Sequence, residues 1–227
     1  IPGALPGDVA RVKVIQDKGT YLRGELLDVL EPSPDRVDFF CPHAERCGGC
    51  QWQELAYPAQ LRWKRIILEE SLRRIGRIED VPVEECIPSP LRKGCRTIAR
   101  FPVKQTASGP VMGYFGRRSH RIVNLDSCPL STERVNIIAA QIRSNPQIRR
   151  LDVREATIRA GYNHSSALVS LLTGAPARFE SLAEGMLNDI ENLAGVSFWR
   201  ETGPGQSRRI KTHGIPHRYE TVLGRTF

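Results

Sequence analysis

Three cysteines within ten residues constrain this chain more than any other feature of its sequence. Cys41, Cys47 and Cys50 are separated by five and two residues, and Gly48 and Gly49 fill the shorter gap. Thiolates at this spacing reach one small volume only where the backbone turns tightly, which glycine permits because it tolerates positive φ. Iron–sulfur clusters and structural zinc both bind such thiolate sets, and each requires four ligands. The spacing therefore predicts a metal site and leaves the metal open.

The fourth ligand separates the two metals. His43 could complete a zinc site, but it lies only two residues from Cys41, and zinc modules usually pair two short knuckles. Cys128, followed by Pro129, is a distant fourth thiolate that fits an iron–sulfur cluster better. A chance grouping of thiols is the third alternative. Cys86 and Cys95 stand apart, and we expect them to be small buried or half-buried side chains.

The charge of the chain favours a polyanionic partner. Lys and Arg number 33 against 25 Asp and Glu, a net charge of +8. The excess is local, because residues 91–121 contain eight basic residues and no acid, and residues 202–219 are also free of acids. A basic run is often only a solvated face, but a stretch of this length indicates a phosphate-binding surface. No apolar run approaches the ~20 residues that span a bilayer, and no signal-peptide pattern opens the chain.

Periodicity predicts an α+β fold. Residues 10–14 and 21–30 alternate as two strands of a small barrel, and Pro58 opens a helix that Gly76 ends in a left-handed cap. A second domain has a mainly antiparallel sheet with packed helices. Its predicted strands are 97–103, 111–115, 121–124, 156–160, 167–172, 196–199 and 218–223. Its predicted helices begin at Ser131 and at Phe179, and they end near Arg143 and Leu193.

Several motifs together resemble one protein family. The cysteine motif is followed by Gln53, by the run Tyr57-Pro58-Ala59-Gln60-Leu61 and by Lys64. Further motifs are Pro6-Gly7-Asp8, Ser33-Pro34-Asp35-Arg36-Val37, Gly113-Tyr114-Phe115, Ser119-His120-Arg121-Ile122-Val123, Cys128-Pro129-Leu130 and the final seven residues. This set resembles the RNA (uracil-5-)-methyltransferases, which contain an OB-like TRAM domain and an iron–sulfur segment.

The resemblance implies a cofactor and a domain plan. It implies a 4Fe-4S cluster on Cys41, Cys47, Cys50 and Cys128. It divides the chain into a TRAM segment at 1–39, incomplete at its N-terminus, an iron–sulfur segment with its helix at 40–95, and a central RNA-binding domain at 96–227. Family members transfer a methyl group from S-adenosylmethionine to uridine C5 in tRNA or 23S rRNA, using a catalytic Cys and a Glu in a Rossmann-like domain.

That catalytic domain is expected to be absent from this chain. No strand, glycine-rich turn and helix suited to S-adenosylmethionine is visible, and the sequence stops at Phe227. The expectation is therefore a truncated, cytoplasmic RNA-recognition portion that is inactive alone, lacks its methyltransferase domain in cis, and contains no catalytic or S-adenosylmethionine-binding residue. Cys95 and Thr97 depart from the family's Tyr-Arg-Asn pattern around Arg96.

Five arginines are the predicted RNA contacts: Arg96, Arg100, Arg117, Arg118 and Arg121. Trp52, Tyr114 and Phe115 are candidates for stacking on bases, although each fits a core role as well. Two rival interpretations remain, a stand-alone RNA-binding module with a structural zinc, and a redox protein. The redox interpretation has little support because no flavin or nicotinamide motif accompanies the cysteines.

Overall fold

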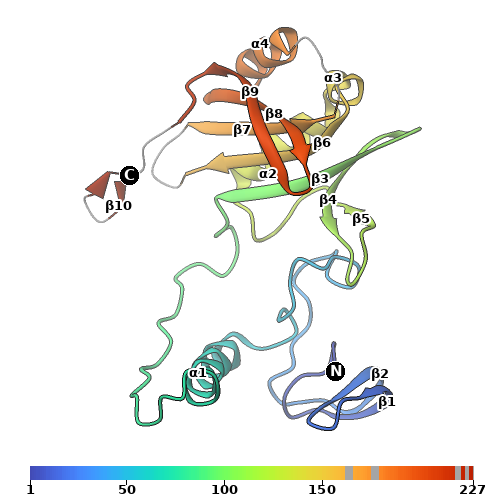
Figure 1. The fold of residues 1–227 in the computed structure, drawn as a ribbon, viewed down its shortest axis with the longest axis vertical. Coiled ribbons are helices and arrows are strands. Elements are labelled where there is room, and N and C mark those ends of the chain that lie inside the picture. The colour runs from blue at the N-terminus through green and yellow to red at the C-terminus, as the bar shows by residue number, and fades with distance from the viewer. Residues whose placement is uncertain (162–165, 175–178, 218–220, 223–224, 227) are drawn as a thin grey trace. The chain divides into compact units, whose positions relative to one another are not determined.

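A computed structural model describes residues 1–161, 166–174, 179–217, 221–222 and 225–226. The chain forms two compact units (Figure 1). The first unit contains residues 1–44 and 50–90, and the second contains residues 45–49 and 91–227. The chain therefore leaves the first unit for five residues at Glu45–Gly49 before it returns. The predicted division at residues 39 and 95 stays a prediction.

The first unit opens with a β-hairpin. Strands β1 (Val9–Asp17) and β2 (Leu22–Glu31) pair antiparallel, as the alternation of apolar and charged residues predicts. Their turn is closed by the Asp17 carboxylate, which accepts a hydrogen bond from the Gly19 N–H at 2.7 Å, and Gly19 has a φ of +75°. Most side chains of both strands are exposed, so the hairpin encloses little apolar core of its own.

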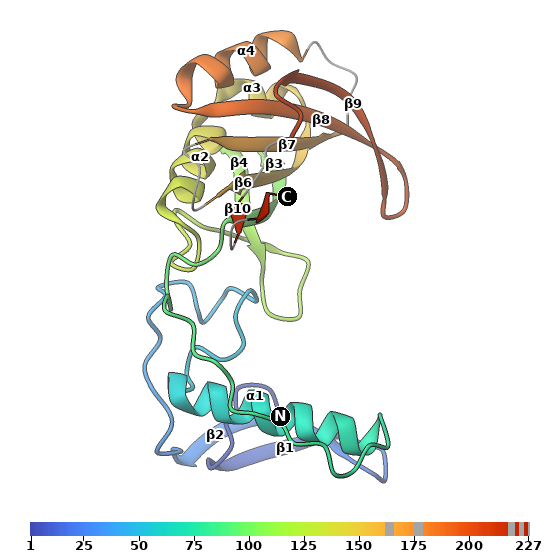
Figure 2. The same cartoon turned by 90° about the vertical axis from the view of Figure 1, so that its left-hand side faces the viewer.

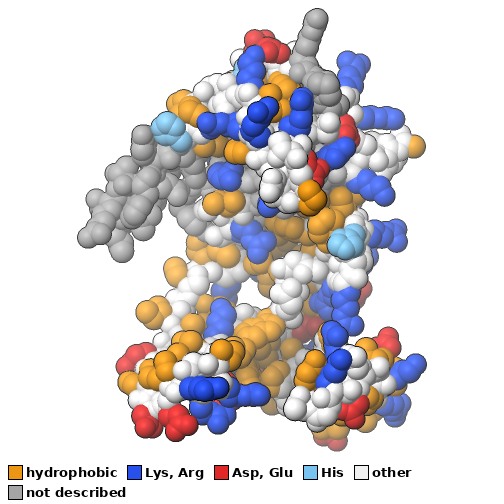
Figure 3. Space-filling view, viewed as in Figure 1, with side chains coloured by type: hydrophobic (Ala, Val, Ile, Leu, Met, Phe, Trp, Pro, Cys, Tyr) orange, Lys and Arg blue, Asp and Glu red, His pale blue; other side chains and the backbone are white. Residues whose placement is uncertain are grey.

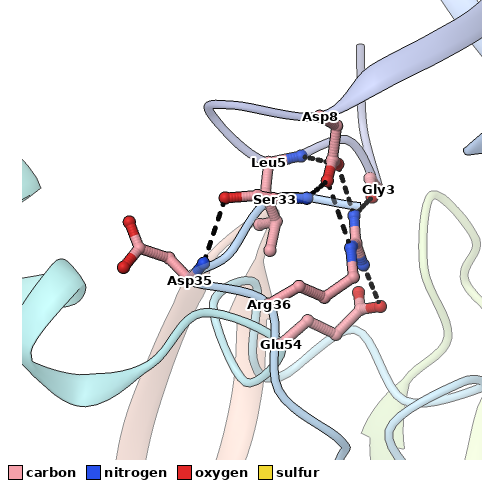
Figure 4. Close-up of polar contacts among 7 residues, drawn as sticks. All are labelled: Gly3, Leu5, Asp8, Ser33, Asp35, Arg36 and Glu54. Atoms are coloured by element: carbon pink, nitrogen blue, oxygen red, sulfur yellow. Dashed lines mark hydrogen bonds and ion pairs between the residues drawn. The ribbon is translucent and has the colours of Figure 1, made fainter. Parts of the chain in front are cut away.

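An ion-pair network around the buried Asp8 carboxylate ties the start of β1 to the segment after β2 (Figure 4). The Arg36 guanidinium contacts the Asp8 carboxylate at 2.5 Å and the Glu54 carboxylate at 2.6 Å. The Asp8 side chain is only 1% exposed, and it also accepts the backbone N–H groups of Leu5 and Ser33. The hydrogen bond from Arg36, which outweighs the opposing effect of burial, holds the pKa of Asp8 well below its usual range. The hydrogen bond to Asp8 in turn raises the pKa of Arg36.

Helix α1 (Tyr57–Arg74) follows in the first unit, with Pro58 in its first turn as predicted. The helix ends earlier than residue 76, and the cap differs from the prediction. The residue with a left-handed backbone is Arg77, at φ +53°, rather than Gly76. Glycine at 76 is instead required by a close approach, because a Cβ there would lie 2.8 Å from the Leu72 carbonyl oxygen.

The second unit is built on a seven-stranded sheet in the order β5-β4-β3-β6-β7-β8-β9. The strands are β3 (Ile98–Thr106), β4 (Gly109–Phe115), β5 (Ile122–Asn124), β6 (Val153–Ala160), β7 (Ala167–Thr173), β8 (Leu193–Gly203) and β9 (Gln206–Gly214). The sheet is mixed, because β7 and β8 run parallel and α4 (Glu180–Asp189) connects them. The prediction of a mainly antiparallel sheet did not include this βαβ unit.

Three helices pack against one face of this sheet (Figure 2). They are α2 (Glu133–Ser144), α3 (Pro146–Arg150) and α4. The predicted apolar stripe of α2 is confirmed, since Val135, Ile138 and Ile142 are all buried in the core. Thr132 rather than Ser131 caps this helix, its hydroxyl accepting the Val135 N–H at 3.4 Å. The apolar side chains between helices and sheet are the main source of stability in this unit.

Three elements differ from the sequence-based expectation. Helix α4 ends at Asp189, and Leu193 starts β8 instead of extending the helix. Strand β9 and helix α3 were not predicted. The predicted strand 218–223 and the turn 161–164 lie largely outside the described residues, although β10 (Thr221–Val222) pairs with β11 (Arg225–Thr226).

Candidate functional site

The loop that carries Cys47 belongs to the second unit and lies against the end of β4. Cys47 forms an isolated antiparallel bridge with Gly116, and the Gly48 N–H donates to the Phe115 carbonyl oxygen at 2.9 Å. A Cβ on residue 48 would lie 2.9 Å from that same oxygen. Glycine at this position therefore allows the loop to approach the strand closely enough to form these bonds.

Gly49 places an N–H donor on the sulfur of Cys47. The Gly49 N–H lies 3.4 Å from Cys47 Sγ, and a Cβ on residue 49 would lie 3.6 Å from the Tyr114 ring. Cys47 itself is 9% exposed. The sulfur of Cys47 is therefore shielded from water and accepts one backbone N–H.

Cys128 is held by a single side chain of α2. The Cys128 N–H donates to Asn136 Oδ1 at 2.9 Å, and Asn136 Nδ2 donates to the Cys128 carbonyl oxygen at 3.1 Å. The same carbonyl oxygen also accepts the Ser131 N–H at 3.0 Å. Arg143, one further residue of α2, donates to the carbonyl oxygen of Leu125. Side chains of α2 therefore fix the 125–128 loop by hydrogen bonds to the backbone of the loop. Cys128 itself is 9% exposed.

The environment of the Tyr114 hydroxyl includes both buried cysteines of the second unit. Burial is the main cause that raises the pKa of Tyr114, and Cys128 and Cys47 raise it further by electrostatic repulsion. Arg96 opposes this shift, because its Nη1 donates to the Tyr114 hydroxyl at 3.4 Å and its guanidinium lies 5.9 Å from the ring centre. The structure thus brings Cys47, Cys128, Tyr114 and Arg96 into one neighbourhood of the second unit.

The other two predicted ligands are Cys41 and Cys50. Cys41 and Cys50 belong to the first unit and are half-buried, and none of the six cysteines forms a disulfide. Among the residues that the structure describes, no three His, Cys, Asp or Glu side chains come together as a metal-binding group. The four-cysteine ligand set therefore stays a prediction.

The five predicted arginines separate into three places. Arg117, Arg118 and Arg121 are exposed in the turn between β4 and β5, which the Gly116 N–H closes by donating to the Arg121 carbonyl oxygen at 2.8 Å. Arg100 lies on β3, 71% exposed, and pairs with Glu155 at 2.5 Å. Arg96 is half-buried beside Tyr114, so it is the least available of the five to a ligand.

The stacking candidates differ in exposure. Phe115 is 45% exposed, with its ring edge-on to His120 at 5.9 Å. Tyr114 is half-buried and packs on Phe101 at 5.2 Å, which matches a core role. Trp52 is half-buried in the first unit.

Sequence reasoning missed Asn136 and Arg143. Asn136 is a polar residue between the buried Val135 and Ile138, and it follows the Cys128-Pro129 pair by one helical turn and a short loop. Its place on α2 could have been noted as unusual. Arg143 offered no such signal, since a basic residue in the last turn of a helix is ordinary. Burial lowers the pKa of Arg143, and the charge of Asp126 opposes that shift.

Comparison with known sequences finds RNA methyltransferases along the whole chain. Residues 1–27 match the family described as the TRAM domain. An uncharacterized RNA methyltransferase of Nostoc sp. is 33% identical over 246 aligned residues, which cover 100% of this chain and 53% of that protein. One from Synechocystis sp. is 32% identical, with 90% of this chain and 44% of that protein covered.

A solved structure shares the fold. The Pyrococcus abyssi tRNA (uracil-54, C5)-methyltransferase in complex with S-adenosyl-L-homocysteine is 20% identical with a TM-score of 0.66. The match covers 100% of this chain and 53% of that one. This chain therefore spans about half the length of the curated relatives and of the solved structure that it matches.

These alignments correct the prediction of a truncated, inactive RNA-recognition portion that lacks a methyltransferase domain in cis. That prediction is wrong, because RNA methyltransferases align with 90–100% of the chain, and the chain matches the fold of 53% of a solved methyltransferase. The alternative of a structural zinc is not tested by these alignments and stays a prediction. The prediction of a missing domain relied on the lack of a glycine-rich motif and on the end of the sequence at Phe227. Neither observation gives information about the fold of the residues that are present. No described helix is long and apolar enough to cross a membrane.

Proposed function

We propose that the protein is an RNA (uracil-5-)-methyltransferase, which transfers the methyl group of S-adenosylmethionine to C5 of a uridine in tRNA or 23S rRNA. The alignment of RNA methyltransferases with the whole chain carries this proposal. The solved structure of the same fold contains S-adenosyl-L-homocysteine, the product that S-adenosylmethionine leaves after methyl transfer, and this supports the methyl donor. The TRAM match at residues 1–27 supports an RNA substrate.

The turn between β4 and β5 is the first proposed RNA contact. Arg117, Arg118 and Arg121 are exposed there, in a stretch of 31 residues without an acid. Arg118 has a φ of +52°, so the turn is tight and its guanidinium groups leave the backbone from neighbouring positions. Each arginine that neutralises a phosphate releases counterions from the RNA, which makes the binding sensitive to salt.

A 4Fe-4S cluster on Cys41, Cys47, Cys50 and Cys128 is the second part of the proposal. In the second unit, Cys47 and Cys128 are shielded from water, and Cys47 accepts the Gly49 N–H, as thiolate ligands of iron commonly do. Asn136 holds the backbone of Cys128 in place without using its sulfur. The cluster, when bound, supplies iron–thiolate bonds that fix its ligands in one place.

Deletion of the gene from its own organism tests the activity. Digestion of tRNA and rRNA to nucleosides, with mass spectrometry and mapping of 5-methyluridine, should show the loss of this base at one position. Reintroduction of the intact gene should restore it. If every 5-methyluridine of the wild type persists in the deletion strain, the proposed activity is refuted.

Metal analysis after purification without oxygen tests the cluster. Iron and acid-labile sulfide of about four each per chain are expected. Cys128→Ser should lower both, whereas the matched variant Cys86→Ser, at a cysteine outside the predicted set, should lower neither. Equal iron in the two variants would remove Cys128 from the ligand set, and about one zinc without sulfide would refute the cluster.

A further inference from the structure

Among the described residues of the second unit, the seven-stranded sheet has helices on one face only. Helices α2, α3 and α4 pack on that face (Figure 2), and we call the opposite one the uncovered face. Figure 1 views the second unit from this uncovered side. An open sheet face of this size in a basic protein is a candidate interaction surface.

Strand register identifies the side chains on this face. Phe101 and Val103 of β3 point into the core, so Arg100, Pro102 and Lys104 point to the uncovered side. The paired residues of neighbouring strands share that side, because residues directly opposite in a ladder lie on one face. They are Glu155, Thr157 and Arg159 on β6, Leu168, Ser170 and Leu172 on β7, Ser197 and Trp199 on β8, and Arg209 on β9.

The part of the uncovered face on β7 and β8 is neither a sealed core nor a charged surface. Its side chains are all half-buried and lie on these two adjacent strands: Leu168, Ser170, Leu172, Ser197 and Trp199. Small hydroxyl side chains, aliphatic side chains and one indole form a low platform. Flat platforms of this kind suit nucleic-acid bases, which have an apolar face and polar edges.

Basic side chains surround this platform. The register places Arg100, Lys104, Arg159 and Arg209 on the face, against the acids Glu155 and Glu201. Both acids are already paired, Glu155 with Arg100 at 2.5 Å and Glu201 with Arg154 at 3.4 Å. Within the described residues, Lys104, Arg159 and Arg209 make no ion pair. Figure 3 shows the excess of Lys and Arg over Asp and Glu on this side of the second unit.

We propose that the uncovered face of the sheet binds an unpaired segment of RNA, with bases over the half-buried platform and phosphates at Lys104, Arg159 and Arg209. Bases of an unpaired strand reach a flat surface, whereas those of an A-form duplex are stacked inside it. The inference rests on the proposed function only in taking RNA as the ligand. It adds a surface distinct from the β4–β5 turn.

Fluorescence anisotropy of a labelled, unstructured 12-nucleotide RNA tests the proposal over a range of salt concentrations. Lys104→Ala with Arg159→Ala should weaken binding several-fold and flatten the slope of log affinity against log salt by about 1.4, at about 0.7 per contact. The matched control is Arg149→Ala with Arg150→Ala, which removes two exposed arginines from α3 on the helix-covered side. This control should keep the wild-type slope.

Two further variants separate RNA contact from folding. Lys104→Arg with Arg159→Lys keeps both charges and should keep the wild-type slope of log affinity against log salt. A slope that falls in this variant as well would contradict a role for the two charges. Trp199 is the indole on this face, whereas Trp52 and Trp63 are in the first unit. RNA should therefore change the intrinsic fluorescence of the wild type, and Trp199→Phe should lose part of that change.

The outcomes separate this inference from the proposed activity. If the two alanine variants bind RNA with equal affinity and slope, or if a blunt RNA duplex competes as well as the single strand, the platform is refuted. The activity then still stands if the deletion strain lacks 5-methyluridine. If the platform variant alone loses binding while the deletion strain keeps every 5-methyluridine, the surface stands and the activity fails.

Discussion

The two units of this protein are stabilised by different interactions. In the second unit, a continuous apolar cluster fills the space between the sheet and helices α2, α3 and α4. In the first unit, the buried apolar side chains are few, chiefly Ala44, Leu55 and Ala59. This unit has instead an ion-pair network in which Arg36 and Glu54 are half-buried and the Asp8 carboxylate is buried. The difference teaches that a small β-hairpin unit without a large core can be fixed by a polar network, provided that every group in it is paired.

Removal of a large core side chain should have the largest effect. Phe198 is fully buried and stacks on Phe179 with ring centres 4.4 Å apart. Phe198→Ala should lower the free energy of unfolding of the second unit by about 3–5 kcal/mol, because it leaves a cavity. Hydrogen exchange read by mass spectrometry measures each unit separately. Exchange in the first unit that accelerates as much as in the second would contradict the comparison.

Removal of the Arg36 guanidinium should have the second-largest effect, and it should act on the first unit. Arg36→Met leaves the Asp8 carboxylate, which is 1% exposed, without its partner. We expect a loss of about 3 kcal/mol, at the lower end for a buried pair because the Arg36 side chain is 18% exposed. The control is Arg62→Met, whose pair with Asp35 is largely exposed and should cost below about 1 kcal/mol. Equal losses in the two variants would show that the network does not hold the unit.

A smaller effect is expected at the loop of Cys128. Asn136→Ala removes both side-chain hydrogen bonds to the Cys128 backbone, which should cost about 1–3 kcal/mol. The rate at which a thiol reagent modifies Cys128 should rise, because the loop opens more often. Asn188→Ala, at an exposed position of α4, is the control. Unchanged reactivity of Cys128 would mean that Ser131 and the chain around it suffice to fix the loop.

The mildest test lowers the pH. Because the pKa of folded Asp8 is below its unfolded value, this carboxylate contributes stability at pH values above about 4, and the contribution is lost as the pH falls further. Amide exchange in the first unit should therefore accelerate, relative to the second, between about pH 4 and pH 2.5. Asp8→Asn should remove this pH dependence. If Asp8→Asn shows the same pH dependence of amide exchange as the wild type, another group causes the acid sensitivity.

The sequence predicted the elements whose signal is local. Strand β1 follows an alternation of apolar and charged residues, and α1 and α2 follow a helical apolar stripe, with Pro58 in the first turn of α1. The cap of α2 was placed one residue too early, at Ser131 instead of Thr132. Strand β9 was missed because Arg208, Arg209 and Lys211 suggest a solvated run. Its strand conformation depends on pairing with β8, which is a tertiary effect. The end of α4 was placed too late, because Ile190 and Leu193 continue the apolar pattern of the helix.

The candidate site was only partly predictable for the same reason. Cysteine spacing singled out Cys47 and, by its Pro, Cys128, and both are buried in the second unit. The role of Asn136 depends on the position of α2 beside the 125–128 loop, and no one-dimensional pattern encodes that distance. Likewise, a run of arginines does not reveal that Arg96 points to Tyr114 while Arg117 and Arg118 are exposed.

Residues 45–49 belong to the second unit although the residues on both sides of them belong to the first. This limits where the chain can be cut into two independent fragments. A polypeptide that begins at Leu91 would lack the Cys47 loop, and with it the Gly48 hydrogen bond to Phe115 and the bridge to Gly116. A protease that cuts between residues 80 and 90 would leave the N-terminal fragment still bearing one piece of the other unit. The two units are therefore interleaved parts of one chain, and recombination between relatives would preserve both only by exchanging residues 45–49 together with the β4–β5 turn.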